Sequence, residues 1–133
     1  MPAVDPDHWL YRLSPTDWLK AAEVELARAS EALVKKSHRA GLTGARRAAG
    51  MALNAVLAVA LDDSYGRSYM DHLKALAVDK SATPSVHEAA RALLSAPLDA
   101  GLVQLGPGST ELADHANTVL DHARGLVAHT AQA

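Results

Sequence analysis

The pattern of apolar positions predicts a long amphipathic helix near the start of the chain. Ser14 and Pro15 suit a helix start, because serine caps well and proline fits the first turn. With 3.6 residues per turn, the apolar residues that follow share about one third of the circumference. These residues are Trp18, Leu19, Ala22, Leu26, Ala29 and Leu33. Glu25 is the only acid inside this stripe, and Gly41 is predicted to end the helix.

The second predicted helix begins near Thr43 and is apolar almost all round over residues 45–61. Its few interruptions are Arg46, Arg47, Gly50 and Asn54. A helix of this kind needs neighbours on most sides, so it is either central in a bundle or part of a dimer surface. Its longest apolar run, residues 48–61, is shorter than the roughly 20 residues that span a bilayer. We therefore expect a core helix and no membrane association.

Three more helices are predicted, over residues 69–78, 86–96 and from Ser109 or Thr110 to about 129. Pro97 closes the second of these, and the glycines of 98–108 indicate a loop. We expect residues 1–13 to form an N-terminal arm and residues 14–133 to form a single helical domain. The pattern predicts an all-α fold, a four- to five-helix up-and-down antiparallel bundle.

Composition supports this fold and narrows the function. The 133 residues are dominated by alanine, the best helix former, and include no phenylalanine or cysteine. The absence of cysteine excludes disulfides and thiolate chemistry in this chain, and no signal peptide is visible, so we expect a cytoplasmic protein. The formal net charge of −2 gives no general attraction to nucleic acid.

Three segments together resemble a known family of small helical bundles. The first helix carries Trp18, Ala21, Ala22, Glu25-Leu26, Ala29 and Leu33. The second carries Ala48, Ala49, Ala52, Leu53 and Ala55, and the third segment carries Asp71-His72-Leu73 and Leu76. This order is similar to that of HEPN domains, and the resemblance covers residues 16–78. Where the family tends to place Glu and Lys in the second helix, this chain has Gly50, Met51 and Asn54.

The resemblance implies an antiparallel bundle, frequently a homodimer. It also implies roles that range from ribonuclease toxins to non-catalytic partners of nucleotidyltransferase proteins. We expect a non-catalytic binding or interaction module, a homodimer with a nucleotidyltransferase-like protein as its partner, and no cofactor. The alternatives are a metal-independent ribonuclease toxin of a toxin–antitoxin pair and a nucleotide-binding domain whose ligand is RNA or a nucleotide.

Ribonuclease members of the family use an arginine followed a few residues later by a histidine. Arginine stabilises phosphate charge, and histidine transfers protons during cleavage. This chain has two Arg-x4-His matches, Arg67 with His72 and Arg124 with His129. Arg67 and His72 are the candidate catalytic residues. The competing interpretation is a solvent-facing arginine and a histidine that hydrogen-bonds within the bundle.

Glu25 is the predicted buried polar residue, and it needs a cation or hydrogen-bond donors because its stripe is apolar. Arg46, Arg47 or His72 is its expected partner across the bundle. The densest basic cluster consists of Lys35, Lys36, His38, Arg39, Arg46 and Arg47.

From this cluster, Arg39, Arg46 and Arg47 are the candidate residues for binding an anion, with help from the amides that open the second helix. The alternative is a solvated helix end. His115, His122 and His129 recur every seven residues on the last helix, which is too far apart for two of them to bind one metal ion. No metal site is predicted.

Overall fold

The computed structural model describes residues 12–97 and 110–132, and within these ranges it contains five α-helices and no strand. The helices are α1 (Pro15–Val34), α2 (His38–Val59), α3 (Tyr69–Ala77), α4 (Pro84–Ser95) and α5 (Glu111–Gln132). A short 3-10 turn, η2 (Asp63–Tyr65), precedes α3. The predicted all-α bundle is therefore confirmed. The loop 98–108 and most of the predicted arm lie outside the described residues.

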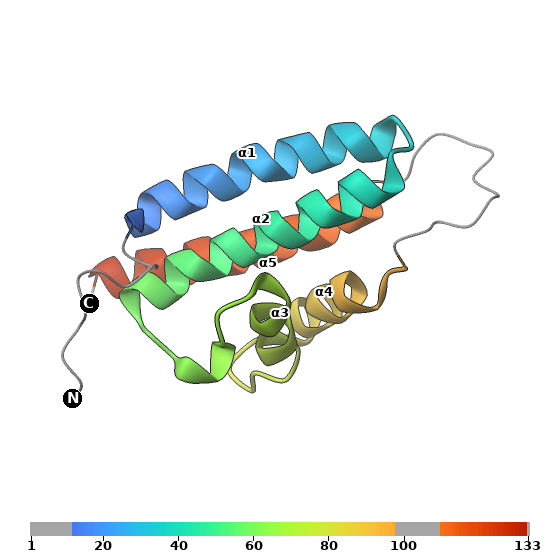
Figure 1. Ribbon diagram of the computed structural model, residues 1–133. Helices are drawn as coiled ribbons and strands as arrows, with labels where there is room; N and C mark the ends of the chain where they lie inside the picture. The colour runs from blue at the N-terminus through green and yellow to red at the C-terminus, as the bar shows by residue number, and fades with distance from the viewer. Residues whose placement is uncertain (1–11, 98–109, 133) are drawn as a thin grey trace.

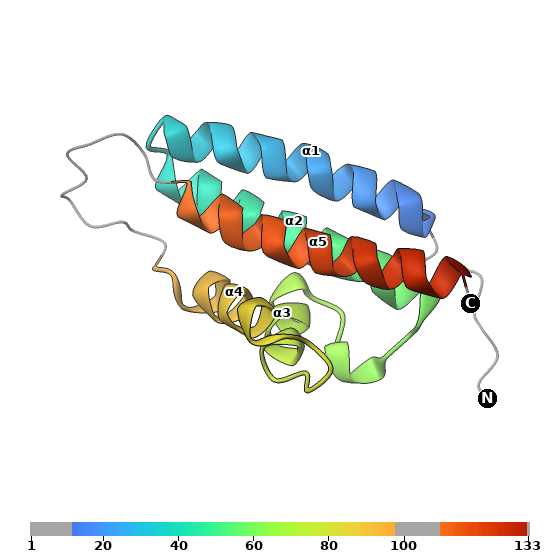
Figure 2. The same cartoon turned by 180° about the vertical axis from the view of Figure 1, so that it is seen from behind.

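Helix α2 is the central element of the bundle, as its pattern predicts. It contacts all four other helices. Figure 1 shows that α1 runs antiparallel to α2 and that α5 runs parallel to α2. Figure 2 shows α5 lying along both α1 and α2. Each of the alanines on the inner surfaces of α2 is at most 1% exposed; they are Ala45, Ala48, Ala49, Ala52 and Ala55. The alanine surface is thus used within a single chain.

The boundary between α1 and α2 differs from the prediction. Helix α1 ends at Val34, and Lys36 adopts the left-handed conformation (φ 62°) that turns the chain back. Gly41, the predicted end of the first helix, lies inside α2, which starts at His38 rather than near Thr43. A Cβ atom on Gly41 would lie 2.4 Å from Leu33 Cδ2, so this glycine permits close packing of the two helices.

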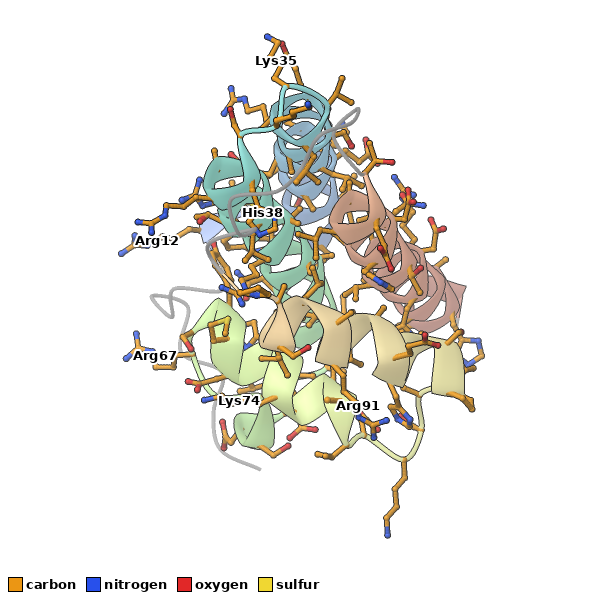
Figure 3. All side chains as sticks on the ribbon, turned by 90° about the vertical axis from the view of Figure 1, so that its right-hand side faces the viewer. Arg12, Lys35, His38, Arg67, Lys74 and Arg91 are labelled. Atoms are coloured by element: carbon orange, nitrogen blue, oxygen red, sulfur yellow. The ribbon has the colours of Figure 1, made fainter. Side chains whose placement is uncertain are left out.

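Helices α3 and α4 lie at an angle beneath α2 and α5 (Figures 1 and 3). Ser68 opens α3 with a capping box, and Pro84 occupies the first turn of α4. Side chains from α4 hold the end of α3 and the link that follows it: Arg91 donates to the Ala77 carbonyl (3.3 Å), and the His87 ring lies 2.5 Å from the Asp79 carbonyl. The link that carries Asp79 is therefore fixed on the bundle.

None of the helices within the described ranges combines the length and the apolar content that a bilayer crossing requires. Both boundaries of α3 and α4 agree with the prediction to within two residues.

Candidate functional site

His72, the predicted catalytic histidine, is completely buried. Its Nδ1 lies 2.7 Å from the Tyr65 carbonyl oxygen, and its Nε2 lies 2.7 Å from the side-chain oxygen Oδ1 of Asn54. The ring of Tyr69 meets it edge-on, with centroids 6.4 Å apart. Burial lowers the pKa of His72, although the Tyr65 carbonyl and the charge of Asp71 oppose this shift. Both ring nitrogens are occupied by the protein itself, so this histidine has no position for a substrate oxygen.

The arginines of the two Arg-x4-His matches are on the surface. Arg67 is exposed and points away from the helices in Figure 3. The structure therefore gives Arg67 and His72 opposite environments. Arg124 lies on α5, where it donates to Asp121 (2.9 Å) and, across to α1, to Glu23 (2.8 Å). His129 is exposed near the end of the same helix.

Glu25 finds its partner in Arg47, one of the three candidates. Arg47 Nη1 lies 3.4 Å from Glu25 Oε2, and Arg28 Nη1 lies 3.4 Å from the other carboxylate oxygen. The Glu25 side chain is only 15% exposed, while Arg28 and Arg47 remain largely open to solvent. The pair thus joins α1 to α2 at the edge of the core.

The predicted anion-binding residues are divided between two roles. Arg46 turns toward the end of α4, where its guanidinium donates to the carbonyls of Leu93 (2.8 Å), Ala96 (3.1 Å) and Leu94 (3.3 Å). The cation there neutralises the carbonyls that a helix end leaves without partners. Burial lowers the pKa of Arg46. Arg46 is therefore occupied in holding α4 against α2.

Arg39 and Arg47 line a shallow depression at the start of α2, together with Thr43. The rest of the basic cluster is spread around the same end of the bundle. Lys35 is paired with Glu31 at 2.8 Å and projects outward in Figure 3, and His38 lies 2.7 Å from the Pro97 carbonyl. Because Arg47 also faces Glu25, the positive charge at this depression is partly neutralised.

The three histidines of α5 have separate environments. His115 lies 3.8 Å from Glu111, His129 is exposed, and His122 is half-buried beside a cavity. In the part of the chain that the structure describes, no three potential metal ligands come together. Of the three, only His122 takes part in a larger polar arrangement.

A cavity lies at the end of the bundle opposite the α1–α2 turn. It measures about 210 Å³ and is bounded by the last turns of α2, by η2, by the α3–α4 link and by the end of α5. Its apolar wall consists of Leu53, Val56, Leu57, Ala60 and Leu126. Its polar wall consists of Asp62, Tyr65, Asp79, Ser81, His122 and Thr130.

Asp79 is the centre of this polar wall. Its Oδ2 accepts a 2.5 Å hydrogen bond from the Tyr65 hydroxyl, and its Oδ1 accepts from the backbone amide (2.9 Å) and the hydroxyl (2.6 Å) of Ser81. These bonds lower the pKa of Asp79, which is therefore ionised at neutral pH. Burial and the neighbouring carboxylates raise the pKa of Tyr65, while burial lowers that of His122.

Sequence reasoning missed this arrangement. One local signal was present: Asp62 and Asp79 each begin an Asp-x-Ser turn, and each accepts from the amide and the hydroxyl of the serine two residues later. That signal predicts turns. It does not predict that Tyr65, Asp79 and His122, from three separate segments, would face one cavity.

Comparisons of the chain with protein-family models, with curated proteins and with solved structures gave no match.

Proposed function

We propose that this chain is a small cytoplasmic binding module without catalytic activity, one of the roles that its resemblance to HEPN domains implies. The observation that carries the proposal is the burial of His72 with hydrogen-bond partners at both ring nitrogens. A general acid or base must reach the proton that it transfers, directly or through one water molecule. A homodimer and a nucleotidyltransferase-like partner belong to the same proposal.

The surfaces of the bundle fit such a role better than its interior does. Because the inner alanines of α2 are covered within one chain, a partner must contact other residues. Three of the large apolar side chains that remain exposed are at or near the cavity end of the bundle: Leu61 (53% exposed), Val78 (73%) and Leu126 (39%). Leu126 lines the cavity, and Val78 lines a second depression that shares Asp62 and Asp79 with it. We therefore place the binding region at this end.

An RNA-cleavage assay tests the proposal against the ribonuclease alternative. Labelled single-stranded RNA is incubated with the wild type, with Arg67→Ala and with Arg124→Ala, which change the two surface arginines and leave the core intact. We expect no cleavage above a protein-free control for any of them. The proposal fails if the wild type cleaves RNA and either substitution slows cleavage at least tenfold without changing the melting temperature.

A further inference from the structure

The cavity at the α2–α5 end offers a ligand two distinct surfaces. One is an apolar wall from α2 and α5, on which Val56, Ala60 and Leu126 are at least partly exposed, while Leu53 and Leu57 behind them are at most 3% exposed. The other carries the carboxylates of Asp62 and Asp79. Within the described structure, no lysine or arginine lines the cavity. Its charge is therefore negative, and a ligand that is itself an anion would be repelled.

The hydroxyl groups in the polar wall are already used as donors. Those of Tyr65 and Ser81 donate to Asp79, and that of Thr130 donates to the Leu126 carbonyl. A carboxylate offers about four acceptor sites. The described bonds to Asp79 take three of these, from Tyr65 and Ser81. The polar wall therefore offers a ligand mainly hydrogen-bond acceptors. The ligand group that matches it is a hydrogen-bond donor with a positive charge.

From this combination we propose that the cavity binds a small primary amine with an apolar body. The ammonium group lies at Asp79 and Asp62, and the apolar body packs on Val56, Ala60 and Leu126 of the opposite wall. A cavity of about 150 Å³ holds benzene, so 210 Å³ accommodates an aromatic ring or a short alkyl chain with its ammonium group. This inference rests on the proposed function, since it takes the chain to be a binding protein.

The test is a titration of the full chain at pH 7 with 2-phenylethylamine, followed by NMR through the ring C–H signals of His122. Two compounds of the same shape serve as controls: 2-phenylethanol, which is neutral, and phenylacetate, which is an anion. We expect the amine to shift the His122 signals with a dissociation constant on the order of 1 mM or tighter. The alcohol should bind at least about tenfold more weakly, because it lacks the charge-assisted hydrogen bond. Equal binding of alcohol and amine overturns the proposal.

Substitutions locate the site. Asp79→Asn keeps the shape and the acceptor for Ser81 but removes the charge, so we expect the amine to bind about tenfold more weakly. Asp63→Asn is the matched control, because Asp63 is exposed and does not line the cavity. Leu126→Trp, at the rim of the cavity, should block amine binding while leaving the fold intact. If Asp79→Asn does not fold, this variant alone tests whether the amine binds in the cavity. Amine binding that survives Leu126→Trp overturns the proposal.

A lysine side chain of another protein carries the same ammonium group on an alkyl chain. Nα-acetyl-lysine methylamide, titrated in parallel, separates the two sources. Tighter binding of 2-phenylethylamine supports the proposal that the ligand is a free amine. Tighter binding of the lysine derivative overturns that proposal. A negative result in these titrations leaves the RNA-cleavage test unaffected, so failure of this inference is distinguishable from failure of the proposed function.

Discussion

Tyr65 lies between two polar clusters that the fold encloses to different degrees. Its backbone carbonyl belongs to an inner cluster with Asn54, Tyr69 and His72, and its hydroxyl belongs to an outer cluster with Asp79, Ser81 and His122. In the inner cluster the imidazole is completely buried and hydrogen-bonded on both sides. In the outer cluster a half-buried imidazole lies beside an ionised carboxylate at an open cavity. Similar side chains thus serve stability in one place and are available to a ligand in the other.

The two histidines provide the strongest test of this difference. His72→Ala leaves the Asn54 amide and the Tyr65 carbonyl without their partner and opens a cavity in the core. We expect a loss of about 3 kcal/mol in the free energy of unfolding, measured by urea denaturation at pH 7. His122→Ala should cost less than about 1 kcal/mol, because its side chain is only half-buried. Equal losses would show that the outer cluster is as structural as the inner one.

Two glycines extend the comparison to the backbone. A Cβ atom on Gly50 would lie 2.1 Å from Tyr69 Cδ1 and 2.5 Å from Tyr69 Cβ, so rotation of the ring alone cannot make room. Gly50→Ala should therefore lower the free energy of unfolding by about 1–2 kcal/mol, even though alanine favours the helix. A Cβ atom on Gly125 would meet nothing within 4 Å.

Gly125→Ala should accordingly raise the free energy of unfolding by up to about 1 kcal/mol, through helix propensity alone. Both variants are measured in the same denaturant series. If both substitutions stabilise the chain, the inner cluster is not as tightly packed as described. If both destabilise it, the end of α5 is covered by contacts that the described residues do not provide.

The sequence predicts the helices better than it predicts the roles of charged residues. Apolar periodicity depends on local spacing, and it correctly placed α3, α4 and the central position of α2. The α1–α2 boundary was missed because Gly41, which commonly ends helices, here permits contact with Leu33. The role of Arg46 depends on where the end of α4 comes to lie, and this position is decided by tertiary packing.

The same limit applies to the two sites. The sequence singled out His72 by its distance from Arg67, but spacing alone does not reveal that the ring is sealed from solvent. For Glu25, the stripe predicted a cation as partner but left three candidates, and only the packing of α1 on α2 selects Arg47. The outer cluster joins segments far apart in the chain, and neither spacing nor composition indicates that they meet.

The last expected effect is on the dependence of stability on pH. Burial lowers the pKa of both His72 and His122 in the folded chain, while an unfolded chain takes up a proton near the ordinary value of 6.5. Below that pH the unfolded state binds more protons than the folded state. The contribution of the two histidines to the free energy of unfolding is therefore fully present above pH 6.5. It falls as the pH drops toward the lowered pKa values, by at most about 1.4 kcal/mol per pH unit for each histidine.

Measurements between pH 5 and 7 isolate this effect, because a carboxylate with a lowered pKa, such as Asp79, loses its contribution only as the pH falls below about 3.8. Urea denaturation of the wild type and of His122→Gln at several pH values within this range shows how much each cluster contributes to the slope of the free energy of unfolding against pH. We expect His122→Gln to remove less than half of the slope, since His72 is completely buried and His122 is not. A slope that disappears in His122→Gln would mean that the inner imidazole accepts a proton without cost. Its two hydrogen bonds would then favour the charged ring, and the distinction between the two clusters would rest on exposure to solvent alone.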